Sequence, residues 1–191
     1  NPGLKILKNI CGIETNLNTY HLGYVLGPRI NAGGRVGKCS HGANLLLSQD
    51  PKEVFKIASE LENFNNERKF LEKDMLNKIE KKIVPDPSEP VTVLSGYNLH
   101  GGIIGIIASR LKDKFNKPTI IISISNGVGR ASARSVYGFD IGTFIINAVQ
   151  KKIILKGGGH KMAAGFSIKE EKIAQFTDFI NKCFLKVKKD L

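Results

Sequence analysis

The hydrophobic positions of this chain follow one pattern before residue 85 and another after it. From Val54 to Ile79, apolar residues recur at steps of three and four, so one stripe stays apolar over roughly thirty residues, or about 45 Å of helix. Asp50-Pro51-Lys52-Glu53 predicts a capping box at the start of this helix, and three prolines between residues 84 and 90 end it. A helix this long exceeds one small domain, so we expect it to connect two parts of the chain.

Residues 1–49 carry shorter helical patterns around a glycine-rich segment. Apolar positions 4, 7 and 10 predict a helix ending at Gly12, a second helix is expected after Asn18, and Ser40 is expected to cap a third through Leu47. Residues 26–38 hold four glycines, one proline and three cations, which is too irregular for a helix. We predict a shaped functional loop there, with a surface turn between helices as the alternative.

After residue 85, apolar runs alternate with amphipathic helical patterns. Strands are predicted at residues 91–94, 119–124 and 163–168, a polar strand or loop at 129–135, and helices at 103–115, after Asp140 and near the C-terminus. This alternation predicts an α/β domain. The predicted organisation is residues 1–49, a connecting helix over 50–84, and the α/β domain over 85–191.

Gly157-Gly158-Gly159-His160 is the first candidate for chemistry. Three glycines have no side chains to keep a ligand away, and their N–H groups can turn toward an anion beside the histidine. We predict a phosphate-binding loop. A glycine triplet alone is more often a flexible turn before a strand, so this prediction depends on the rest of the chain.

Two further segments offer donors to phosphate. His100-Gly101-Gly102 precedes a predicted helix whose first N–H groups can receive an anion, although a capping or core role for His100 is equally consistent with the sequence. Ser132 and Arg134 alternate at strand spacing and so share one face, with Ser135 next to them. The alternative is an exposed edge strand protected by its charge.

The charge balance favours a polyanionic partner. The formal net charge is +12 and the pI is near 9.7, although lysine-rich solvated helices give the same balance. Four of the six arginines, Arg29, Arg35, Arg130 and Arg134, lie in predicted loops or polar segments, where a planar guanidinium can bind phosphate bidentately.

Other classes of site and location are disfavoured. The three cysteines and four histidines are scattered, so we expect reduced thiols and no metal site. No apolar run approaches the ~20 residues of a membrane span, and no signal peptide begins the chain, so we expect a cytoplasmic protein cut from a longer one.

Four motifs, taken in order, resemble the later half of the RecJ family of single-stranded-DNA-specific exonucleases, in the DHH phosphoesterase superfamily. They are Leu26-Gly27-Pro28-Arg29-Ile30-Asn31-Ala32-Gly33-Gly34-Arg35, His100-Gly101-Gly102-Ile103-Ile104-Gly105, Ser132-Ala133-Arg134-Ser135 and Gly157-Gly158-Gly159-His160-Lys161-Met162-Ala163-Ala164-Gly165. The last motif alone indicates only the DHH-associated domain shared with nanoRNases and alanyl-tRNA synthetases. The arginine-containing segment and the long helix after it narrow the resemblance to the RecJ family.

The resemblance implies a fold and an activity. The fold is a DHH-associated α/β domain with a mixed sheet flanked by helices, preceded by a connecting helix and the helical end of the catalytic domain. The activity is that of a 5′-to-3′ exonuclease of DNA repair and recombination, whose Mn²⁺ or Mg²⁺ ions are held by aspartates and an Asp-His-His motif. No Asp-His-His occurs in this sequence, so we expect a fragment that binds single-stranded DNA without cutting it. We also expect this fragment to be monomeric.

Two alternatives remain, a nanoRNase-type oligonucleotide phosphodiesterase and a non-catalytic nucleic-acid-binding module. His160 is predicted to have a supporting catalytic role. The predicted phosphate-binding residues are Arg29, Asn31, Arg35, His100, Ser132, Arg134, Ser135, Gly157, Gly158, Gly159 and His160.

Overall fold

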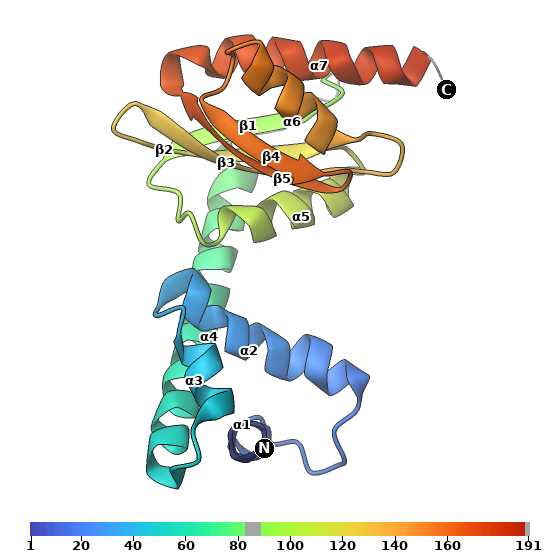
Figure 1. Ribbon diagram of the computed structural model, residues 1–191. Coiled ribbons are helices and arrows are strands. Elements are labelled where there is room, and N and C mark those ends of the chain that lie inside the picture. The colour runs from blue at the N-terminus through green and yellow to red at the C-terminus, as the bar shows by residue number, and fades with distance from the viewer. Residues whose placement is uncertain (83–88, 190–191) are drawn as a thin grey trace. The chain divides into compact units, whose positions relative to one another are not determined.

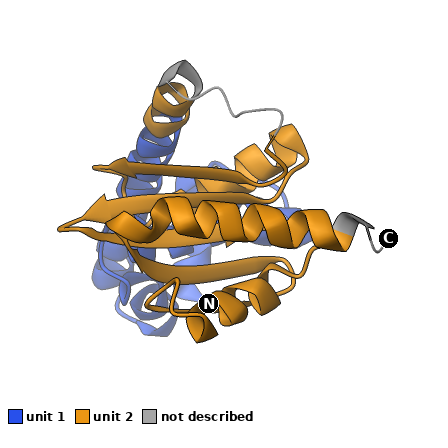
Figure 2. Ribbon diagram, turned by 90° about the horizontal axis from the view of Figure 1, so that it is seen from above, with its two compact units in different colours: residues 1–73 blue, residues 74–191 orange. Residues whose placement is uncertain are grey.

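The computed structural model describes residues 1–82 and 89–189, which belong to two compact units, residues 1–73 and 74–191 (Figure 2). The boundary between the units falls within one long helix, α4 (Pro51–Lys82). Most of the proline-rich break, and the domain boundary predicted at residue 85, lie outside the described residues. The three-part division of the chain therefore stays a prediction.

The first unit is helical and has its own core. It contains α1 (Pro2–Ile10), a π-helix η1 (His21–Leu26), α2 (Gly27–Val36), α3 (His41–Leu47) and the first part of α4 (Figure 1). Its buried core residues are Leu7, Leu26, Leu45, Val54, Ile57, Ala58 and Leu61. The last four lie on α4 at steps of one and three residues, so the predicted apolar stripe is confirmed over this part of the helix.

Residues 26–38, predicted to be a loop, are largely helical, and that prediction is wrong. Pro28 lies in the first turn of α2, where its missing N–H costs no hydrogen bond. Three of the glycines stand where a side chain would collide with its neighbours. A Cβ would lie 2.8 Å from Leu22 O at Gly27, 2.7 Å from Lys38 O at Gly33 and 2.5 Å from the Phe64 ring at Gly37. Glycine is therefore explained here by close packing between segments, not by a looped backbone.

The helix caps differ in detail from those predicted. Ser40 occupies the N-cap position of α3, but its side chain makes no capping hydrogen bond. At the start of α4, Asp50 accepts a hydrogen bond from Lys52 N–H at 3.0 Å. The carboxylate of Glu53 accepts from Ser48 Oγ at 2.5 Å. This end of α4 is therefore capped by Asp50, while Glu53 is bonded to the preceding turn.

The second unit is built on a mixed five-stranded sheet with strand order β1-β2-β3-β5-β4. Strand β1 (Thr92–Tyr97) runs parallel to β2 (Thr119–Ser125). The remaining neighbours, β3 (Val128–Arg134), β5 (Ala163–Lys169) and β4 (Lys156–His160), pair antiparallel. The predicted α/β class with a mixed sheet is confirmed.

Helices lie on both sides of this sheet. Figure 1 shows α6 (Ile141–Gln150) and α7 (Ile173–Lys189) on one side and α5 (Ile104–Phe115) on the other. Inward-facing side chains of the strands, such as Ile122, Ala133 and Phe166, join residues of α6 and α7 in one core. Helix α5 packs against β2 and β3. One side of the sheet is therefore fully used by the core, and the other is covered only in part.

Gly157-Gly158-Gly159-His160 was predicted to be a loop, and that prediction is wrong. These residues form most of edge strand β4. It pairs with β5 in a hairpin in which Gly158 lies opposite Gly165 and His160 opposite Ala163. Extended backbone is open to glycine as to any residue, and the hydrogen bonds to β5 fix it. The prediction fails because glycine is usually rare within strands, so the pattern favours a loop.

The stability of the first unit is expected to depend on pH through Glu60. His41 Nε2 contacts Glu60 Oε2 at 2.5 Å, and this hydrogen bond lowers the pKa of Glu60 below its ordinary value of 4.5. A lowered folded-state pKa contributes stability above the unfolded value, and that contribution is lost as pH falls through the folded-state pKa. In Glu60→Gln, the free energy of unfolding should therefore fall less than in wild type as the pH drops below about 4.5. Urea denaturation at several pH values measures this. Glu67→Gln, at an exposed position on the same helix, is the control. Equal effects of the two substitutions would contradict this assignment.

Candidate nucleic-acid interface

Nine residues of β3, β5 and β4, five of them exposed and four partly buried, share one side of the sheet, which we call the open face. The strand register arranges them in three rows: Arg130–Ser167–Lys156, Ser132–Gly165–Gly158 and Arg134–Ala163–His160. Directly paired residues share a face, while their neighbours along each strand, such as Ala131 and Phe166, point into the core. Four of the nine are Arg, Lys or His and none is acidic. The open face is therefore suited to an anionic ligand.

Ser132 and Arg134 lie together on this face, as predicted from their spacing. Arg134 Nη1 donates to Ser132 Oγ at 3.3 Å and to the Ala133 carbonyl at 2.8 Å. Strand β3 pairs with β2 on one side and β5 on the other, so the alternative of an exposed edge strand is wrong. The guanidinium is held in position by its own strand, which orients it in advance of any ligand.

The first turn of α5 packs directly against this pair. A Cβ on Gly105 would lie 2.9 Å from Ser132 Oγ and 3.2 Å from Arg134 Nη2. Only glycine therefore lets the helix backbone approach the hydroxyl and guanidinium so closely. Because the aligned peptide dipoles of a helix leave a partial positive charge at its N-terminus, this end of α5 adds a positive potential beside Ser132 and Arg134.

His100 and His160 have the same local geometry. His100 Nδ1 accepts a hydrogen bond from Gly102 N–H at 3.2 Å, and His160 Nδ1 accepts one from Met162 N–H at 3.3 Å. Both imidazoles are exposed. With Nδ1 acting as the acceptor, the proton of a neutral ring sits on Nε2, so each histidine presents a donor away from its own backbone.

The three glycines of β4 have different surroundings. A Cβ on Gly157 would lie 2.6 Å from Phe166 Cβ, and one on Gly159 would lie 2.5 Å from Ala164 Cα. Gly142 of α6 approaches the same strand, because its Cβ would lie 2.9 Å from His160 N. These contacts place β4 tightly against β5 and α6. A Cβ on Gly158, in contrast, would meet no atom within 4 Å.

Several predicted site residues lie elsewhere. The Arg29 guanidinium pairs with the Glu62 carboxylate and donates to Val25 O at 2.8 Å, so it stabilises the first unit. Ser135 is buried and its hydroxyl donates to Phe139 O at 2.7 Å, so it does not face the open side. Asn31 and Arg35 are exposed on α2, in the first unit, and the open face belongs to the second.

Arg130, Lys156 and Ser167 also lie on the open face and were not among the predicted site residues, although Arg130 is one of the four arginines expected to be able to bind phosphate. Arg130 follows from the same period of two that indicated Ser132 and Arg134. Lys156 and Ser167 could not be found in this way, because their position depends on the register of β4 and β5.

Neither a metal site nor a membrane segment emerges from the described residues. Within residues 1–82 and 89–189, no three His, Cys, Asp or Glu side chains are grouped so as to hold a metal ion. None of the helices in this described part is both long and apolar enough to cross a membrane.

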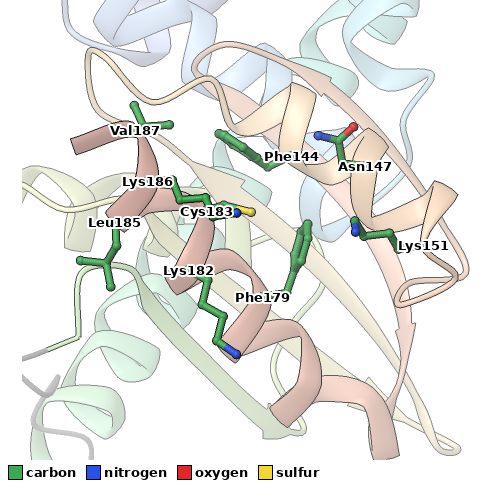
Figure 3. Close-up of a pocket in the computed structure, with 9 residues that line it drawn as sticks. All are labelled: Phe144, Asn147, Lys151, Phe179, Lys182, Cys183, Leu185, Lys186 and Val187. Atoms are coloured by element: carbon green, nitrogen blue, oxygen red, sulfur yellow. The ribbon is translucent and has the colours of Figure 1, made fainter. Parts of the chain in front are cut away.

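A separate groove of about 640 Å³ lies between α6 and α7 (Figure 3). Phe144 and Phe179 line its apolar part, and Lys151, Lys182 and Lys186 stand around it. These helices cover the side of the sheet opposite α5. The groove contains none of the predicted phosphate-binding residues, so it is distinct from the open face.

Comparison with known proteins places this domain in a family. The model of the DHHA1 domain matches residues 88–186, which is more than half of the chain, so the chain belongs to the DHHA1 domain family. Within it, the chain is RecJ-like. It is 37% identical over 171 residues to the single-stranded-DNA-specific exonuclease RecJ of Haemophilus influenzae. It is 34% identical over 186 residues to RecJ of Escherichia coli. The chain spans about a third of these relatives, 29% and 32% of their lengths.

The fold agrees with this assignment. The crystal structure of RecJ from Thermus thermophilus in complex with Mn²⁺ superposes with a TM-score of 0.85 at 28% identity, covering 97% of this chain and 27% of that one. The predicted resemblance to the RecJ family, and with it the predicted fold class, are confirmed.

Alanine substitutions are expected to distinguish the packed glycines from the open one. Gly159→Ala should lower the free energy of unfolding by about 1–3 kcal/mol, because the new methyl group overlaps β5. Gly158→Ala meets open space and Gly158 does not have positive φ, so the stability should be unchanged or slightly higher. Urea denaturation of both variants tests this, and equal destabilisation would show that Gly158 is also a packing position.

Proposed function

We propose that this chain supplies substrate binding to a RecJ-type 5′-to-3′ single-stranded-DNA exonuclease, by holding the phosphates of the strand on its open face. The observation that carries the proposal is the Ser132–Arg134 pair, fixed on β3 and packed against the first turn of α5. It is supported by the relatives, which are named as exonucleases specific for single-stranded DNA.

Each donor of the open face has a separate part in this proposal. The Arg134 guanidinium and the Ser132 hydroxyl bind oxygens of one phosphate, and the N-terminal dipole of α5 stabilises its charge. His160, in the same row as Arg134, offers its Nε2 proton to a phosphate oxygen. A donor at this position either holds the bound phosphate or stabilises charge that develops during cleavage. His100 is a further candidate donor near the start of α5.

The proposal gives the residues of this chain no part in metal binding. Relatives of known structure bind Mn²⁺ or Mg²⁺. The described residues contain no fitting set of ligands, and the whole sequence contains no Asp-His-His. We therefore assign the chain's own residues to binding and orientation of the strand, and no step assigned to them passes through a metal.

Arg134→Gln is expected to weaken binding of a twelve-nucleotide thymidine strand by roughly tenfold or more, since one charge-assisted contact contributes about 1.5–3 kcal/mol. Fluorescence anisotropy at several salt concentrations measures this, and the salt dependence should also decrease. Lys182→Gln, at an exposed position of α7, removes the same charge on the other side of the sheet and is the control. Unchanged affinity in Arg134→Gln would contradict the proposal.

We also expect the 191-residue chain not to hydrolyse single-stranded DNA when Mn²⁺ is added. The family's metal-binding motif does not occur in this sequence, so binding and cleavage should be separable. Release of nucleotides from a labelled strand is the measurement. Hydrolysis that requires Mn²⁺ and disappears in Arg134→Gln would refute this separation of DNA binding from DNA cleavage.

A further inference from the structure

We propose that Arg130, Lys156 and Ser167 form a second phosphate subsite, which binds a different phosphate of the same strand from the one at Arg134. This inference rests on the proposed function of the open face and extends it. The three residues make up one row of the sheet, because Ser167 of β5 pairs with Arg130 of β3 on one side and with Lys156 of β4 on the other.

The row borders a shallow groove of about 490 Å³. Its lining includes all three residues together with Gly158 and Gly165. Arg130 and Lys156 are exposed, and within the described part of the chain neither side chain is paired with a carboxylate. Two such cations beside a hydroxyl form a donor set typical of phosphate recognition.

The distance along the strands separates this subsite from the first. Because the Arg134 guanidinium donates to Ser132 Oγ, the first subsite lies beside Ser132. Arg130 is two residues from Ser132 on β3, which corresponds to about 7 Å at roughly 3.3 Å per residue. In a stacked strand this offset spans about two nucleotide steps of roughly 3.4 Å, and fewer steps in a stretched strand.

The middle row, beyond Ser132, lets the strand pass. Gly158 and Gly165 face each other there without side chains, and both are exposed. No neighbouring atom explains glycine at position 158, since a Cβ would lie in open space. A strand lying against the bare backbone accounts for it, because only glycine allows such a close approach.

The two-subsite arrangement predicts a dependence on strand length. A strand of twelve nucleotides can reach both subsites, whereas thymidine 5′-monophosphate has a single phosphate and can occupy only one at a time. Contacts at Arg130 and Lys156 should therefore contribute to the binding of the long strand and not to that of the mononucleotide bound at Arg134.

The test compares the double variant Arg130→Gln/Lys156→Gln with wild type, using both thymidine ligands in fluorescence anisotropy and competition experiments. Affinity for the twelve-nucleotide strand should fall by roughly tenfold or more. The slope of log affinity against log salt should shrink by about 0.7 for each phosphate that the variant no longer binds. Affinity for thymidine 5′-monophosphate should be unchanged. Lys151→Gln/Lys182→Gln, at the C-terminal end of α6 and on α7, removes the same number of charges and is the control.

The outcomes separate this inference from the proposed function. If Arg130→Gln/Lys156→Gln binds the long strand like wild type while Arg134→Gln binds it weakly, the second subsite is wrong and the proposed function stands. If the double variant loses affinity for both ligands equally, or no more than the control does, the cations act as a general field and the subsite is again wrong. If Arg134→Gln and the double variant both bind like wild type, the proposed function fails as well. Arg130→Lys, which keeps the charge, should retain most of the affinity.

Discussion

The register between β3, β5 and β4 is the constraint on which the candidate interface depends. Side chains alternate across a sheet with a period of two, so a slip of one residue on β3 would turn Arg130, Ser132 and Arg134 into the core and Ala131 and Ala133 outward. The cost of burying two guanidinium groups under α6 and α7 excludes that alternative. The same alternation that builds the core therefore places the polar row on the opposite side. The stability of the fold and the position of the candidate interface are thus two consequences of one pairing.

Glycine fixes this arrangement in two ways, and one further glycine has a different setting. Gly142, Gly157 and Gly159 allow α6 and β5 to approach β4 so closely that the edge strand is fixed along most of its length. Gly105 brings the first turn of α5 against Ser132 and Arg134. Gly158 does neither, since its surroundings are empty. The motif Gly157-Gly158-Gly159 thus combines two packing positions with one position that is open to a ligand.

Much of the fold could be predicted from the sequence where a simple period determines it. The stripe of α4, the apolar run of β2 and the shared face of Ser132 and Arg134 depend only on spacing within one element, and all are confirmed. The errors have a common physical cause. Glycine suggests loops in α2 and β4, whereas the partners that require it come from other segments, such as Phe64 for Gly37 and Ala164 for Gly159.

The functional residues divide in the same way. Residue type and neighbouring residues predict Arg29 and Ser135 as phosphate donors. In the structure, Arg29 is bonded to Glu62, which is distant in sequence, and Ser135 is bonded to the carbonyl of Phe139 in the next turn. Lys156 and Ser167 give no local signal, because only the pairing of two antiparallel strands makes them neighbours.

The net charge of +12 attracts polyanions but cannot by itself locate their site. Lysines also surround the groove between α6 and α7, on the other side of the second unit. What distinguishes the open face is the combination of charge with a bare, flat backbone and donors that their neighbours hold in position. A field of exposed lysines draws in any polyanion and is screened by salt. Arg134 is instead fixed by Ser132 and Ala133. Under the proposed function it binds a phosphate at one place, and the rest of the strand passes over Gly158 and Gly165. On physical grounds, long-range attraction and local positioning are thus separate properties, and only the second depends on the sheet register.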